Sequence, residues 1–193
     1  MRVRIGLLLV LFLFAVPAFA QDAVNVGSGE AAPGSTIEIP ITIVDQGGTP
    51  LGVDAGAGNQ IQGIAVSIAY SPAAAVTKAK IVRSGIAAGL EPMLETNVPK
   101  AGMISYVGAF DASSSLLPFT QPPAEKGDEV LRLQVTLARD ASGTVTLTPV
   151  AATTMLSNVA GTVSEGAHAG NLLLGSGTVA VQSARKPLEP QPE

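Results

Sequence analysis

The chain has 193 residues, a formal net charge of −4 and no cysteine. Its charged residues are scattered, so the basic run typical of nucleic-acid-binding proteins is missing and we expect no nucleic-acid partner. A chain of this length can bury one hydrophobic core without disulfide bonds. Only 13% of the residues are charged, and Gly (21) and Pro (14) are frequent, which favours a turn-rich all-β domain over helices.

Residues 1–20 have the three parts of an export signal. Arg2 and Arg4 give a positive start, residues 6–16 form an apolar run, and residues 18–20 form a small-x-small cleavage site. The apolar run is short for a membrane span, which needs about 20 residues. We therefore expect a secreted, periplasmic or cell-surface protein with no stable membrane span after cleavage. An uncleaved membrane anchor is the alternative.

Alternation of apolar and polar residues predicts strands that bury one face. Pro40 lies within one such stretch and predicts an edge strand or a bulge there. Residues 84–90 predict a helical turn, residues 45–60 a long exposed loop, and residues 151–176 are ambiguous. In chain order, the predicted strands are residues 24–26, 36–44, 61–70, 76–82, 103–110, 130–137, 144–149 and 177–182.

These short, evenly spaced strands with one apolar face each predict an all-β fold. We expect a two-sheet antiparallel β-sandwich of the jelly-roll type with about nine strands, spanning residues 21–182. Residues 183–193 contain prolines and no apolar periodicity, so they are expected to form a tail or linker.

The chain offers little for catalysis. The one histidine, His168, lies in a Gly-rich loop that would hold a general base poorly. Residues 27–32 and 175–180 match a loose dinucleotide-binding pattern, but neither leads into the helix that such binding needs. Glu91 and Glu95 are close in sequence, whereas glycosidase carboxylates face each other across a groove. We expect no enzyme activity and no cofactor.

The loop at residues 45–60 contains Asp45, Asp54 and Asn59, whose oxygen atoms are of the kind that Ca²⁺ prefers. Their spacing matches no EF-hand, and Asp and Asn are also common turn residues. We therefore expect no metal site, while calcium binding by this loop stays open.

Proteins that grip polysaccharide surfaces usually present exposed aromatic rings. This chain has no Trp, and Tyr70, Tyr106 and Phe110 fall on strand faces that are expected to be buried. Phe119, in the loop that follows residue 111, is the one good candidate for an exposed ring.

With the strands placed, residues 23–182 resemble a cohesin module, a β-sandwich related to carbohydrate-binding modules of families 2 and 3. In cohesins the segment that matches residues 63–72 ends in Tyr-Asp-Pro, and here Ser71 replaces the Asp. The resemblance rests on residues 24–27, 33–41, 63–72, 76, 80–82, 102–106, 131–137 and 145–147.

The resemblance implies a non-catalytic module, because cohesins bind dockerins and so gather polysaccharide-degrading enzymes on scaffolds or cell surfaces. It implies a dockerin-like or another extracellular protein as partner; a carbohydrate-binding module with a polysaccharide ligand is the alternative. Dockerin-binding cohesins often carry polar side chains on the solvent side of the strand at residues 61–70, whereas this chain has small residues there. The expected contact residues are Gly63, Ala65, Ser67, Ser105 and Val107.

Overall fold

A computed structural model describes residues 20–111 and 116–182 of the chain. Most of the expected export signal and the expected tail at residues 183–193 lie outside the described residues. Within the described ranges, no helix is long and apolar enough to cross a membrane.

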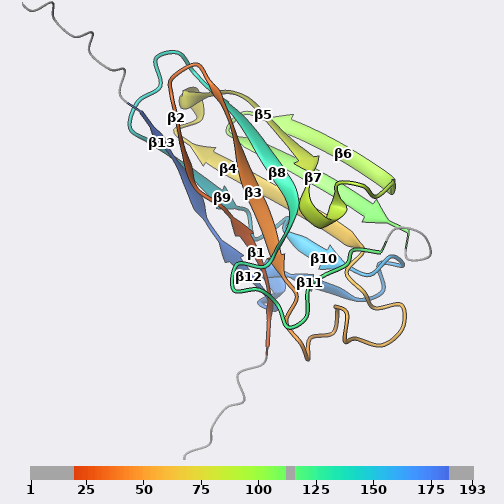
Figure 1. The fold of residues 1–193 in the computed structure, drawn as a ribbon. Helices are drawn as coiled ribbons and strands as arrows, with labels where there is room; N and C mark the ends of the chain where they lie inside the picture. The colour runs from red at the N-terminus through yellow and green to blue at the C-terminus, as the bar shows by residue number, and fades with distance from the viewer. Residues whose placement is uncertain (1–19, 112–115, 183–193) are drawn as a thin grey trace, which may run out of the picture.

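The described chain folds into two β-sheets that pack face to face (Figure 1). In spatial order, the first sheet contains β12 (Leu172–Gly175), β1 (Asp22–Val26), β3 (Thr36–Val44), β8 (Asp128–Leu137) and β5 (Val76–Arg83). The second sheet contains β11 (Ser164–Gly166), β10 (Met155–Ser157), β4 (Gly63–Ser71), β9 (Thr144–Pro149), β13 (Gly177–Val181) and β2 (Gly29–Ala31), with β7 (Met103–Phe110) beside β4 and β6 (Pro92–Lys100) beside β7. The short 3₁₀ helices are η1 (Ala73–Ala75), η2 (Gly85–Ala87) and η3 (Ala167–Ala169).

The predicted all-β sandwich is confirmed, but its strands are more numerous and their pairing is mixed. The part of the chain that the structure describes has 13 strands, because β2, β6, β10, β11 and β12 were not predicted. Two pairs are parallel, β1 with β12 and β13 with β2, whereas an antiparallel sandwich was expected. Both parallel pairs join the beginning of the domain to its end.

Alternating side chains fill the core between the sheets. In β8, Leu131, Leu133 and Val135 are fully buried, and in β4 the inward residues Ile64 and Val66 are buried as well. Strands with one apolar face can stack only with those faces together, so the sequence pattern dictates the two-layer architecture.

The prediction for Pro40 is correct in part. Pro40 lies in β3, between β1 and β8, so it is not on an edge strand. The register of β3 with β8 shifts between Ile41 and Thr42, directly after the proline. Proline cannot donate to the ladder, and this irregularity beside it is the expected compensation.

The segment between β3 and β4 is not the fully exposed loop that its glycines predicted. Asp45, Leu51 and Ile61 in this segment are buried. The Thr49 hydroxyl donates a hydrogen bond to the Leu51 carbonyl at 2.6 Å, which shapes a compact turn. The segment therefore packs over one end of the sandwich and leads directly into β4 (Figure 1).

Candidate functional site

The five predicted contact residues lie together on the outer face of the second sheet. The register of β4 with β7 pairs Ala65 with Val107 and Ser67 with Ser105. Gly63 lies two residues before Ala65 on the same strand and therefore on the same side. Directly paired residues in a sheet point to one face, so the five positions form a single surface.

These positions differ in what they offer to a partner. Val107 is 37% exposed, whereas Ser67 is only 3% exposed. The hydroxyl groups of Ser67 and Ser105 lie 2.7 Å apart and form a hydrogen bond along the surface. Ser67 is therefore available to a partner only through small parts of its surface, and its hydroxyl is engaged with Ser105.

Two strands that were not predicted widen this surface on both sides. The pairing of β6 with β7 places Val98 beside Ser105. The pairing of β10 with β4 places Met155 beside Ala65. The surface therefore runs across four strands, in the order β6–β7–β4–β10.

Large apolar side chains gather on this surface. Leu94, Val98, Val107 and Met155 are 52%, 44%, 37% and 44% exposed, respectively. Among the described residues of these four strands, Lys100 at the end of β6 is the one charged residue on this side. We call the surface formed by Leu94, Val98, Val107, Met155 and the small residues between them the outer apolar face. Contiguous exposed apolar surface of this kind is typical of interaction sites.

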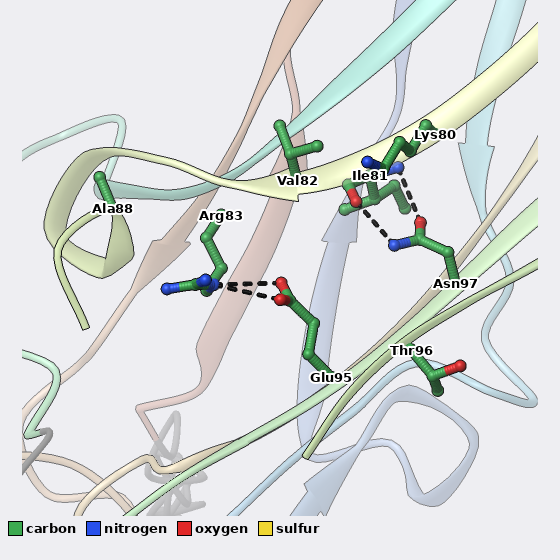
Figure 2. Close-up of a pocket in the computed structure, with 8 residues that line it drawn as sticks. All are labelled: Lys80, Ile81, Val82, Arg83, Ala88, Glu95, Thr96 and Asn97. Carbon is green, nitrogen blue, oxygen red and sulfur yellow. Dashed lines mark hydrogen bonds and ion pairs between the residues drawn. The ribbon is translucent and has the colours of Figure 1, made fainter. Parts of the chain in front are cut away.

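The edges of the two sheets meet along a groove of about 400 Å³ between β5 and β6 (Figure 2). The side-chain amide of Asn97 in β6 reaches across this groove to the backbone of Ile81 in β5. Its Nδ2 donates to the Ile81 carbonyl, and its Oδ1 accepts from the Ile81 N–H, both at 2.9 Å. The Asn97 side chain thus bonds to β5 in the way that a neighbouring strand would.

An ion pair crosses the same groove. The Arg83 guanidinium lies 3.2 Å from Oε1 of Glu95, which also accepts a hydrogen bond from the Tyr106 hydroxyl at 3.1 Å. Burial, followed by the charge of Glu95, raises the pKa of Tyr106, so this hydroxyl stays protonated and donates. The polar groups of the groove therefore bond to one another and brace β6 against β5. Among the described residues that line this groove, Glu95 is the one carboxylate.

The other residues considered for chemistry do not form a reactive site. His168 is exposed in η3 and has no hydrogen-bond partner among the described residues. The two dinucleotide-like stretches run into β2 and β13, not into helices. Phe119 is only 7% exposed, so the prediction of an exposed ring is wrong. Phe119 packs with the core because its loop folds back against the sandwich.

Asp45, Asp54 and Asn59, the residues considered for calcium, each bond to a different group of the protein. Their side-chain oxygens accept hydrogen bonds from the Val53 N–H, the Gly48 N–H and the Asn158 amide, respectively. In residues 20–111 and 116–182, no group of three or more His, Cys, Asp or Glu side chains could hold a metal ion.

Neither a protein-family model nor a curated protein sequence matches the chain. Its fold, however, is similar to those of solved cohesin domains. One is the third cohesin of ScaC from Acetivibrio cellulolyticus, solved with the ScaB dockerin, at 17% identity and a TM-score of 0.60, covering 84% of this chain and 99% of that one. Another is the OlpA cohesin of Clostridium thermocellum, solved with Doc918, at 13% identity and a TM-score of 0.58, covering 84% and 100%.

A third similar structure is a non-cellulosomal cohesin from the archaeon Archaeoglobus fulgidus. It shares 15% identity with this chain at a TM-score of 0.55, and the match covers 85% of this chain and 93% of the archaeal one. At such low identities the likeness establishes the fold and not the partner.

Proposed function

Starting from the cohesin fold, we propose that this chain is a non-catalytic binding module that docks a protein on its outer apolar face. The observation that carries the proposal is the gathering of Leu94, Val98, Val107 and Met155 on one strand surface with almost no charge. The ScaC and OlpA cohesins were solved with dockerins bound, which favours a dockerin-like or another extracellular protein as the partner.

The physical character of the face supports docking. Ala65 lies between Met155 and Val107 in one row of the sheet, so two larger side chains flank a low point. An apolar side chain of a partner that fills this low point would gain about 25 cal/mol for each Å² removed from water. The face is built on paired strands, so little conformational freedom is lost when the partner binds.

A catalytic role has no comparable support, because His168 lies in the short helix η3 and no group of residues that could hold a metal ion is found among the described residues. The export signal expected at residues 1–20 supports a secreted or cell-surface location. A link to polysaccharide degradation rests on the cohesin likeness. Direct polysaccharide binding by this chain is not favoured, since Phe119, the one ring expected to be exposed, is buried.

The test is a binding titration against a panel of purified dockerins that includes the ScaB dockerin and Doc918. We expect at least one dockerin to bind with a Kd of about 1 μM or tighter. Val98→Arg should weaken this binding at least about tenfold, since docking would strip water from the new charge. Leu173→Arg is the matched control, because Leu173 is 53% exposed on β12 of the other sheet.

Two results would contradict the proposal. One is that no dockerin in the panel binds. The other is that Val98→Arg and Leu173→Arg weaken binding equally, which would place the contact elsewhere. Retardation of the chain in gels that contain a soluble glycan, without dockerin binding, would support the carbohydrate-binding alternative instead.

A further inference from the structure

One end of the sandwich contains three acidic side chains that are withdrawn from water. Asp22 begins β1, Asp45 follows β3, and Glu165 lies in the middle of β11. Their exposed fractions are 0%, 1% and 0%. The ion pairs between described residues involve Arg83 and Arg132 and do not reach this cluster. Buried carboxylates without a cation are unfavourable, so these acids need a physical explanation.

Asp22 and Glu165 hold the same segment of the chain from opposite sheets. Oδ1 of Asp22, in the first sheet, accepts a hydrogen bond from the Gln46 N–H at 2.8 Å. Oε1 of Glu165, in the second sheet, accepts one from the Leu51 N–H at 3.2 Å. The two acids thereby tie the segment that precedes β4 to both layers of the sandwich, at Gln46 and at Leu51.

The remaining oxygen of each acid lacks a hydrogen bond. Oδ2 of Asp22 and Oε2 of Glu165 are buried and have no hydrogen-bond partner among the described residues. Each of the two carboxyl groups shifts the pKa of the other, so they act on each other at the end of the sandwich. Carboxylates only accept hydrogen bonds, so a hydrogen bond between them requires that one of the pair carry a proton.

The electrostatics of the cluster agree with this geometry. Burial, together with the charges of Glu165 and Asp45, raises the pKa of Asp22 from 3.8 to about 8. Burial also raises the pKa of Glu165 and of Asp45, and Asp54 and Asp128 add negative charge near Asp45. The folded pair thus keeps a proton that the opened chain releases. Closure is therefore most favourable in mild acid and weakens as the pH rises from about 4 to about 8.

We propose that Asp22 and Glu165 share one proton and with it clasp residues 46–61 onto the end of the sandwich, so that pH controls the closure of this segment. The clasped segment runs directly into β4 at Gly63, and Glu165 pairs with Leu156 of β10. Both strands belong to the outer apolar face. The clasp itself is independent of which partner, if any, that face binds.

Hydrogen exchange of the backbone amides, read by mass spectrometry and corrected for the intrinsic exchange rate, tests the clasp. Protection of peptides within residues 46–61 should fall by up to about tenfold per pH unit between about pH 5 and 8, and then level off. Peptides from β8 should show no such slope. In Asp22→Asn, and more completely in Asp22→Asn combined with Glu165→Gln, the slope should become clearly shallower, because neither replacement can ionise. Asp45, whose pKa is also raised by burial, leaves a residual slope.

Asp140→Asn is the matched control, since Asp140 is exposed in the turn between β8 and β9 and should leave the slope unchanged. The single Asp22→Asn variant keeps the oxygen that accepts from Gln46, which guards against a double variant that fails to fold. Three results would overturn the proposal. They are a wild-type segment without a pH slope, a slope that is undiminished in Asp22→Asn, and a slope abolished by about 1 mM Ca²⁺, which would mean that the acids hold a cation instead of a proton.

Discussion

Replacing Asn97 by Ala tests whether one side-chain amide joins the edges of the two sheets. The change removes two hydrogen bonds of 2.9 Å to the backbone of Ile81. Each such bond contributes about 1 kcal/mol net. The Ile81 groups border a groove of about 400 Å³ that water can enter, so they regain solvent partners and the full penalty for unpaired buried groups does not apply.

The free energy of unfolding should therefore fall by about 1–2 kcal/mol in Asn97→Ala. For a domain of this size, that loss corresponds to a Tm lowered by roughly 2–8 °C. Thermal unfolding followed by far-UV circular dichroism is the suitable assay, because the chain has no Trp and only two Tyr. Asn97→Asp should be at least as harmful, since it keeps the acceptor but turns an oxygen toward the Ile81 carbonyl.

Thr96→Ala is the control for this experiment. Thr96 precedes Asn97 on β6 and also borders the groove, but its pairing with Val107 places its side chain on the outer face. We expect its Tm to stay within about 1 °C of the wild-type value, as is usual for surface substitutions. If Asn97→Ala has the same Tm as Thr96→Ala, the Asn97 side chain does not stabilise the contact between β6 and β5.

Two further predictions concern packing. Leu133→Ala, at a fully buried position in the middle of β8, should lower the free energy of unfolding by about 2–5 kcal/mol, measured by urea denaturation. Gly177→Ala should cost roughly 2–3 kcal/mol or prevent folding, because its Cβ would lie 1.8 Å from the carbonyl oxygen of Gly27 and β13 would have to shift. Gly56→Ala, where a Cβ meets nothing within 4 Å, is the matched control and should melt with the wild type.

The strands that could be predicted from the sequence are those in which buried apolar residues recur at every second position. In β3 and β8, every second residue is a branched apolar side chain that enters the core, so the bounds of β3 were predicted to the residue and those of β8 to within two residues. β6 was missed because both of its sides are largely exposed, apart from the half-buried Pro92 and Asn97, so its apolar residues follow no burial pattern. Pro92 and Pro99 lie in β6, and prolines are compatible with such an edge strand.

The candidate site could be predicted only in part for the same reason. The small residues of β4 and β7 were identified, because those strands were identified. Leu94, Val98 and Met155, which give the face most of its exposed apolar surface, lie on strands that were not predicted. These three residues belong to the outer apolar face because β6 pairs with β7 and β10 pairs with β4. Such pairing between distant strands leaves no local pattern in a single sequence.

Buried acids are still harder to predict from sequence. Nothing in the sequence distinguishes Asp22 and Glu165 from solvent-exposed acidic residues, and carboxylates are seldom fully buried. Their contact depends on the parallel pairing that places β1 beside β12 and on the short strand β11. Phe119 shows the opposite error, because a loop residue was taken as exposed when its loop folds back onto the core.

The interleaving of the first and last strands has a consequence for how the domain is made. Until β12 and β13 leave the ribosome, β1 lacks one neighbour and β9 lacks its partner on one side. A nascent chain that ends before Leu172 therefore presents open strand edges, which are prone to aggregation. The domain matures as one cooperative unit after synthesis of its final strands, and shortening it from the carboxyl end should yield insoluble chains instead of a smaller stable sandwich.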